Sequence, residues 1–258
     1  MGLKPGDTIS TWITCSEAAE SNILHLACYH AGLKLMPFSS GQDLPESLSL
    51  SSALIFSPWE KFNSEYRIDH ILSSLPQLLT TPSGSLVPSP HKTKYFIQTG
   101  FRTIRGTNKL KTIPVYNGNS VSNNGFEIRY KGKDIKSEQV QAFIERFAKD
   151  SGKVVVNSLP AKSPLAIGSL IGTLKAGNKM VSAVSSDPGE AFNLTQADVL
   201  VTSEEQLGAF KQGCSVGKLV LALEDAKDVE RVVKLFEKKG VRAKSVLAYN
   251  SADLSNLV

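Results

Sequence analysis

The chain has 258 residues, of which 41% are apolar and 21% charged, a composition typical of a globular domain that buries a sizeable core. No apolar run reaches the length of about 18 residues that a membrane span needs, so the sequence predicts none. The first twenty residues carry neither an apolar core nor an Arg-rich amphipathic face, so we expect no export or transit signal.

The net charge of +5 is moderately basic, and the basic residues are spread along the chain. Their densest run, from Arg102 to Lys111, has no aromatic ladder or nucleic-acid motif beside it, so we expect no nucleic-acid binding. Cys15, Cys28 and Cys214 are far apart, which favours a reducing compartment over a disulfide framework. His25 lies three residues before Cys28, but no second pair accompanies them, so we predict no metal site.

Apolar runs alternate with amphipathic helices in the first half, which predicts parallel strands joined by crossover helices. The middle of this half is rich in Ser, Pro and Gly at 39–52 and 80–91, which indicates loops. The expected strands are Thr8–Thr14, Leu33–Phe38, Ala53–Ser57, Tyr95–Gln98, Thr112–Tyr116 and Phe126–Tyr130, and the expected helices are Ser16–His30, one near Tyr66–Leu75, and Ser137–Ser151.

The second half shows the same alternation more regularly. The expected strands are Lys153–Asn157, Lys179–Val184, Asp198–Thr202, Leu219–Leu223 and Ala243–Ala248, and the expected helices are Pro164–Ala176, Asp187–Ala197, Ser203–Lys211 and Ala226–Lys239. Gly168 and Gly172, four residues apart, predict close packing of their helix on the sheet. We therefore predict an α/β fold of mostly parallel sheets with helices on both faces, in two βαβ-type subdomains at 1–152 and 153–258.

Several segments of the chain occur in a familiar order. Val154–Pro160 is a strand ending in Leu-Pro, an apolar helix follows, and Ala176-Gly177 precedes the next strand. The opening, Leu3–Thr8, reads Leu-Lys-Pro-Gly-Asp-Thr and leads into a strand. In this order and spacing the chain resembles the N-terminal domain of acyl-CoA synthetases and their adenylate-forming (AMP-binding) relatives, in a truncated and degenerate form.

The resemblance implies a phosphate-binding loop, rich in Ser, Thr and Gly and ending in Pro-Lys-Gly, after one strand. Backbone N–H groups and a lysine meet the ATP phosphates in such a loop. The matching position follows Tyr95–Gln98, where bulky Phe101 and Ile104 replace small residues, so we expect ATP binding to be lost. The residues that still echo the motif are Thr99, Gly100, Gly106, Thr107 and Lys109.

The resemblance also implies a Tyr-Gly-x-Thr-Glu motif, whose tyrosine lies near adenine, whose threonine contacts phosphate and whose glutamate helps to hold magnesium. Here Tyr249 is retained, Asn250 replaces the glycine, Ala252 lacks the threonine hydroxyl, and Asp253 is a shorter carboxylate. The ribose-binding aspartate, the hinge and the small carboxy-terminal domain with its catalytic lysine would lie beyond Val258. We therefore expect a pseudoenzyme with no catalytic residues.

Three functions from different classes remain open, and the first is favoured over the other two. The first is a non-catalytic scaffold, without cofactors, that joins other protein subunits in a larger assembly, for example a mitochondrial respiratory or ATP synthase complex. The second is a relict ligand-binding protein that holds acyl-CoA, a fatty acid or AMP in the ancestral cleft, with ATP and magnesium relevant only there. A third is an enzyme completed in trans by a separate chain. The basic net charge and the compartment common in the resembled family predict a mitochondrial location, with the cytoplasm as the alternative.

Overall fold

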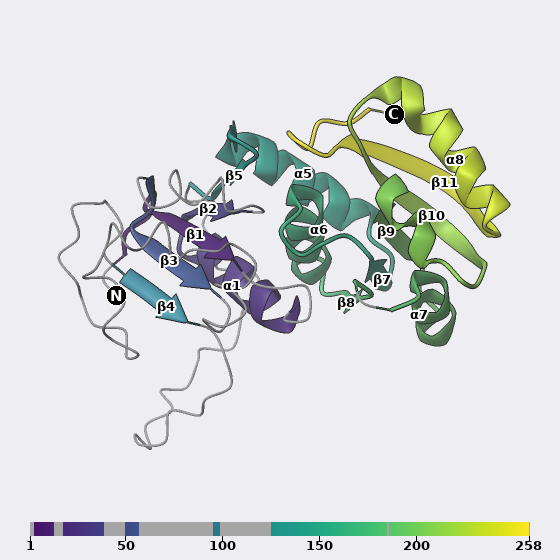
Figure 1. Cartoon of the computed structure of the whole chain (residues 1–258), viewed down its shortest axis with the longest axis horizontal. Helices are drawn as coiled ribbons and strands as arrows, with labels where there is room; N and C mark the ends of the chain where they lie inside the picture. The colour runs from purple at the N-terminus through teal and green to yellow at the C-terminus, as the bar shows by residue number, and fades with distance from the viewer. Residues whose placement is uncertain are drawn as a thin grey trace, which may run out of the picture.

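The computed structural model describes residues 3–12, 18–38, 50–56, 95–98, 125–184 and 186–257, with backbone alone at 18–20, 56 and 95–98. Two sheets lie toward opposite ends of the long axis, with helices between them (Figure 1). A further pair of helices covers the far side of the second sheet. The described residues contain no helix long and apolar enough to cross a membrane.

The first sheet, sheet A, has six strands in the order β4-β3-β1-β2-β5-β6. All neighbours are parallel except β5 and β6, which form an antiparallel hairpin at one edge. Its strands are β1 (Thr8–Trp12), β2 (Lys34–Pro37), β3 (Ala53–Phe56), β4 (Tyr95–Gln98), β5 (Glu127–Tyr130) and β6 (Lys133–Ile135).

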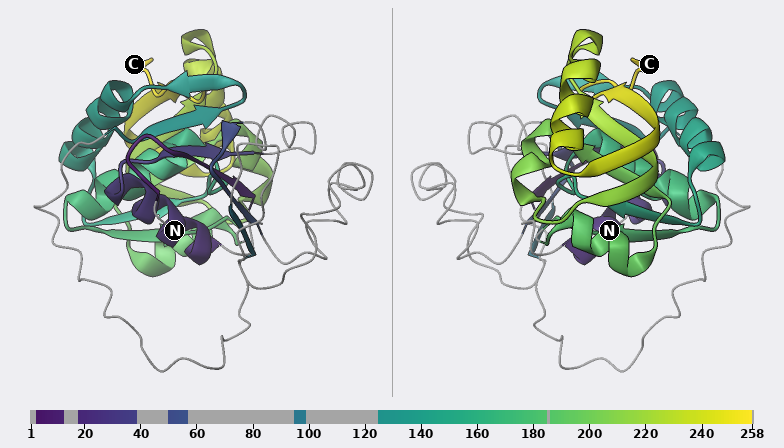
Figure 2. Two further views of the ribbon diagram at one scale, coloured as in Figure 1. Left: turned by 90° about the vertical axis from the view of Figure 1, so that its left-hand side faces the viewer. Right: turned by 90° about the vertical axis from the view of Figure 1, so that its right-hand side faces the viewer.

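The second sheet, sheet B, has five strands in the order β11-β10-β9-β7-β8, all parallel. The β10 and β11 strands are the longest and lie side by side under α8 (Figure 2, right). The strands are β7 (Val154–Asn157), β8 (Lys179–Ser182), β9 (Val199–Ser203), β10 (Cys214–Leu223) and β11 (Val241–Asn250).

The described helices form two layers. The inner layer, between the sheets, holds α1 (Ala18–His30), α5 (Ser137–Asp150) and α6 (Pro164–Lys175). The outer layer on sheet B holds α7 (Pro188–Thr195) and α8 (Val229–Lys238). Two short 3₁₀ turns, η3 (Glu204–Ala209) and η4 (Ala226–Asp228), complete the second half.

Alternation along the strands of sheet B explains why both of its faces are covered. Val155 and Val220 belong to the inner hydrophobic cluster, whereas their chain neighbours Val156 and Leu221 belong to the outer one. Successive side chains of a strand point to opposite faces, so nearly continuous apolar runs bury both. The inner cluster also contains residues of sheet A, including Ile9 and Leu35, and therefore joins the two halves of the chain.

The structure confirms the predicted α/β class of mostly parallel sheets, with helices on both faces of sheet B. The expected elements at Thr112–Tyr116 and near Tyr66–Leu75 lie outside the described residues. The division into subdomains at 152/153 stays a prediction. Three details differ from the prediction. The strand β6 was not predicted, and the helix expected at Ser203–Lys211 is wrong. The strand expected at Leu219–Leu223, β10, begins earlier, at Cys214, because it pairs with the start of β11.

That last segment forms only the 3₁₀ turn η3, and none of its residues is buried. A short helix in water is marginal without an apolar face to pack, so no α-helix is stabilised there. Its position is held instead by Glu204, whose carboxylate accepts two hydrogen bonds from Arg231 of α8 at 2.6 and 2.7 Å.

Gly168 and Gly172 lie on α6, but they pack against a helix and not against the sheet, which corrects the expectation. A Cβ atom on Gly168 would lie 2.6 Å from the ring of Phe143, and one on Gly172 would lie 3.1 Å from the carbonyl oxygen of Ile144. Both partners belong to α5. The two glycines therefore let the backbones of α5 and α6 approach closely in the middle of the molecule.

Substituting Gly168→Ala should lower the free energy of unfolding by about 1–3 kcal/mol, because the new methyl group overlaps a buried ring. Gly208→Ala is the matched control, since nothing lies within 4 Å of its Cβ position and it should be nearly neutral. Urea denaturation of both variants measures the difference. Equal stabilities would contradict the close approach of α5 and α6.

Candidate functional site

The resemblance to adenylate-forming enzymes predicts a degenerate Tyr-Gly-x-Thr-Glu motif at Tyr249–Asp253, and this match stays a prediction. Tyr249 is 1% exposed in the structure, within β11. Its ring meets the ring of Phe143 edge-on, with centroids 4.9 Å apart. The Tyr249 side chain is therefore part of the inner core.

The hydroxyl of Tyr249 is buried and has no hydrogen-bond partner of normal geometry among the described residues. Burial raises the pKa of this phenol, against a smaller lowering by the nearby Arg146 guanidinium. Because the neutral phenol is favoured, the group is suited to packing rather than to acid–base chemistry.

The two polar residues of the motif hold the turn after β11. The Asn250 side-chain oxygen accepts a hydrogen bond from the backbone N–H of Ala252 at 2.8 Å, and its amide nitrogen donates to the carbonyl of Glu224 at 3.0 Å. The Asp253 carboxylate accepts from the N–H of Ser255 at 2.9 Å. Such local bonds are typical of Asx turns, so both side chains have structural roles.

The chain then returns along β11. Residues 254–257 run antiparallel to its end: the N–H of Leu257 donates to the carbonyl of Ala248, and the N–H of Asn250 donates to the carbonyl of Ser255, both at 2.8 Å. Leu254 is buried at 5% exposure, with a left-handed φ of 63°. This return segment therefore covers the outer edge of the last third of β11.

A second polar group lies where the strand order of sheet B reverses, between β7 and β9. Ligands of open α/β sheets commonly bind beyond the strand ends at such a point. Here the hydroxyl of Ser158 donates to Thr202 at 2.8 Å, and the side-chain oxygen of Asn157 accepts from the N–H of Leu159 at 3.0 Å. The bonds of the buried Ser158 hydroxyl, to Thr202 and to the carbonyl of Val201, join the segment after β7 to β9, whereas Asn157 bonds within its own segment.

The predicted phosphate-loop residues Thr99, Gly100, Gly106, Thr107 and Lys109 lie outside the described residues. A Lys-Gly pair among the described residues, Lys131-Gly132, lies between the strands β5 and β6. Lys131 and Gly132 form the turn between β5 and β6, with φ values of 48° and 76°. A two-residue turn with positive φ at both positions is the preferred hairpin connection.

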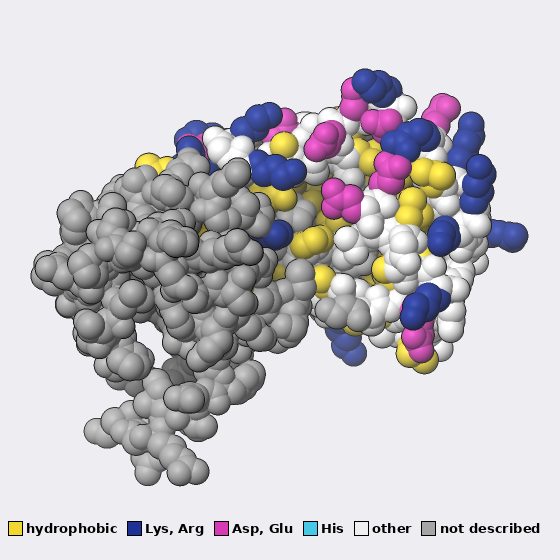
Figure 3. All heavy atoms as spheres, viewed as in Figure 1, with side chains coloured by type: hydrophobic (Ala, Val, Ile, Leu, Met, Phe, Trp, Pro, Cys, Tyr) yellow, Lys and Arg dark blue, Asp and Glu magenta, His cyan; other side chains and the backbone are white. Residues whose placement is uncertain are grey.

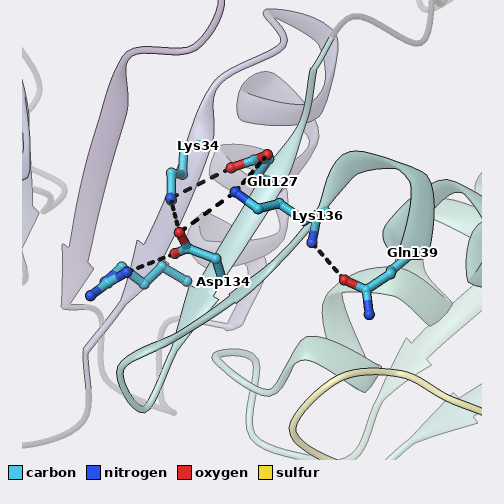
Figure 4. Close-up of polar contacts among 6 residues, drawn as sticks. Lys34, Glu127, Asp134, Lys136 and Gln139 are labelled. Atoms are coloured by element: carbon cyan, nitrogen blue, oxygen red, sulfur yellow. Dashed lines mark hydrogen bonds and ion pairs between the residues drawn. The ribbon is translucent and has the colours of Figure 1, made fainter.

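An ion-pair network fixes this hairpin to β2 (Figure 4). Asp134 binds Lys34 and Arg129, each at 2.8 Å, and Glu127 lies 3.5 Å from both Lys34 and Lys136. Burial disfavours the charge of Asp134, but the two cations bound to it bring its pKa below the usual value. The two carboxylates are paired with three cations, Lys34, Arg129 and Lys136, so this network is a set of ion pairs that fixes the hairpin and leaves its surroundings net positive.

His25 and Cys28 both lie on α1 and are buried. Burial lowers the pKa of His25 to about 4 and raises the pKa of the Cys28 thiol to about 12, so neither is poised for catalysis at neutral pH. The described residues contain no group of three or more His, Cys, Asp or Glu side chains that could hold a metal ion.

The fold has counterparts among solved structures. The N-terminal domain of FACL13 from Mycobacterium tuberculosis superposes with a TM-score of 0.61 at 12% identity, covering 96% of this chain and 63% of that one. The luciferase-like enzyme of the mealworm Zophobas morio gives 0.58 at 15% identity, covering 96% and 60%. The o-succinylbenzoate CoA synthetase of Bacillus subtilis gives 0.59 at 13%, covering 99% and 51%.

No protein-family profile and no curated protein sequence matches the chain. At identities this low, the structural similarity establishes the fold, which is that of the N-terminal domain of adenylate-forming, acyl-CoA-synthetase-like enzymes. The chain spans between half and two thirds of the length of these proteins.

Substituting Tyr249→Phe should change the free energy of unfolding by less than about 1 kcal/mol, because the hydroxyl that it removes has no hydrogen bond to lose. Tyr249→Ala should cost about 3–5 kcal/mol, since it leaves a cavity beside Phe143. Denaturation curves of both variants test this. A large loss in the Phe variant would indicate a partner for the hydroxyl and contradict a packing role.

The buried His25 predicts a pH dependence of stability. Its folded pKa of about 4 lies below the unfolded value of about 6.5, so the unfolded chain binds more protons as the pH falls through this window. Stability is therefore complete above the unfolded pKa and should fall by about 2 kcal/mol between pH 7.5 and pH 5. His25→Leu should remove this loss, and an equal pH dependence of variant and parent would rule the explanation out.

Proposed function

We propose that this chain is an acyl-CoA-synthetase-like domain without adenylation activity, which serves as a structural accessory subunit of a larger protein assembly. The observation that carries the proposal is the position of the motif residues. Tyr249 is in the core, and the polar groups of Asn250 and Asp253 are bonded within the turn. A site for nucleotide needs these groups free to meet a ligand, and catalysis needs them aimed at developing charge.

The Lys-Gly turn supports the same proposal. A phosphate loop requires several consecutive N–H groups around one anion, and a two-residue hairpin turn offers too few. Lys131 is exposed, with its ammonium 5.6 Å from the ring centroid of Tyr130.

The proposal predicts that ATP with magnesium leaves the melting temperature unchanged, because a ligand stabilises a protein only in proportion to its binding. Pyrophosphate exchange with a panel of fatty acids should give no acyl-adenylate. A shift of several degrees with ATP would contradict the scaffold, and binding of acyl-CoA, a fatty acid or AMP in calorimetry would replace it with the relict ligand-binding function.

We place the assembly in mitochondria, on the strength of the basic net charge and the compartment common in the resembled family. A respiratory or ATP synthase complex is the kind of assembly that this predicts. Organelle fractionation followed by native electrophoresis tests both points together. Recovery of the chain as a free monomer in the cytosol would overturn them.

A further inference from the structure

The outer edge of β11 is the longest open strand edge among the described residues. β11 is the last strand of sheet B and pairs with β10 on one side only (Figure 2). Its final residues, Ala248–Asn250, are covered by the return segment 254–257. The preceding stretch, Val241–Leu247, has no strand of the described chain on its outer side.

The return segment shows that this edge accepts an added strand. The outward backbone groups of Ala248 and Asn250 already bond to residues 254–257, and the pairing is antiparallel. The backbone N–H and C=O groups of successive strand residues point alternately to the two neighbouring strand positions. The N–H and C=O of Val246 therefore point to the same outer side as those of Ala248 and Asn250. A strand placed in line with the return segment would therefore find unused hydrogen-bonding groups along β11.

The surroundings of this open stretch are basic. Arg242 and Lys244 on β11 are exposed, and so are Lys238 and Lys239 at the end of α8. None of the four forms an ion pair with a described residue. Lysine and arginine side chains gather at the end of the molecule where α8 passes into β11 (Figure 3). Glu237 is the one acidic residue between Lys234 and Lys244.

We propose that β11 between Val241 and Leu247 is the docking edge of this subunit, and that it takes an extended, acidic segment of a partner protein as an added antiparallel strand. The partner's backbone would bond to the open edge, and its carboxylates would pair with the four cations. The proposal rests on the accessory-subunit function and names the surface through which it acts.

Basic residues on an edge strand have a second use, because charge blocks unwanted pairing between copies of a protein. That use needs charge of either sign and gives no preference for acidic segments. The two roles therefore differ in one observable: whether carboxylates of a partner lie in direct contact with these lysines.

Carbodiimide cross-linking of the native assembly, purified through a tag on the full chain, makes that distinction, since it joins an amine directly to a carboxylate. Cross-links from Lys238, Lys239 or Lys244 to Asp or Glu residues of one partner protein are expected. The docking edge would be overturned if partners cross-link to exposed lysines elsewhere, such as Lys149 on α5, and none cross-links to these three.

The double variant Arg242→Glu/Lys244→Glu should weaken retention of the partner by about tenfold or more, because it replaces attraction with repulsion. Lys149→Glu is the matched control and should retain the partner. Circular dichroism verifies that both variants fold. Retention by the double variant equal to that of the control would sink the proposal.

The remaining outcomes separate this proposal from the one on which it rests. One outcome is that the chain binds phosphatidylserine vesicles but not phosphatidylcholine vesicles, and that the double variant loses this binding but keeps the protein partner. That outcome would assign the basic edge to a membrane surface and overturn the docking strand. An assembly that forms through another surface refutes the docking edge alone. Acyl-adenylate formation refutes the loss of adenylation whatever binds at β11.

Discussion

The close packing of α5 against α6 is the contact on which the rest of the molecule depends. Both helices lie between the two sheets, and their residues form the centre of the cluster that reaches β1 and β2 on one side and β7 and β9 on the other. Gly168 and Gly172 bring the helix backbones together, and Phe143 fills the space that they leave. Loss of this contact would separate two sheets that share one core.

The same contact explains the burial of Tyr249 at the end of β11. Phe143 packs on Tyr249 from the α5 side, so a tyrosine at the end of β11 is held as a core side chain. Asn250 and Asp253 then shape the turn that returns the chain along the strand edge. In our proposal, residues that once met a ligand now stabilise the end of the domain, and the surface available for interaction is the edge of β11.

Much of the fold could be predicted because its signals are local. The buried strands Val154–Asn157 and Val199–Ser203 are β-branched or leucine-rich runs, and α8 carries an apolar stripe at helical spacing. The β5–β6 hairpin was harder, because Lys131 adopts a positive φ without being Asn or Gly, the usual signals of such a turn. The helix expected at Ser203–Lys211 failed since local polarity and Gly208 outweighed a short apolar pattern.

The sequence by itself determined most of the element types and their order, because these depend on side-chain chemistry and spacing within short segments. Only the tertiary structure decided that Gly168 faces a helix, that Tyr249 is buried beside Phe143, and that β11 ends sheet B with part of its edge covered. Those features depend on contacts between residues far apart in the chain. The free energy of such contacts comes from burial and close packing, which no local sequence pattern records.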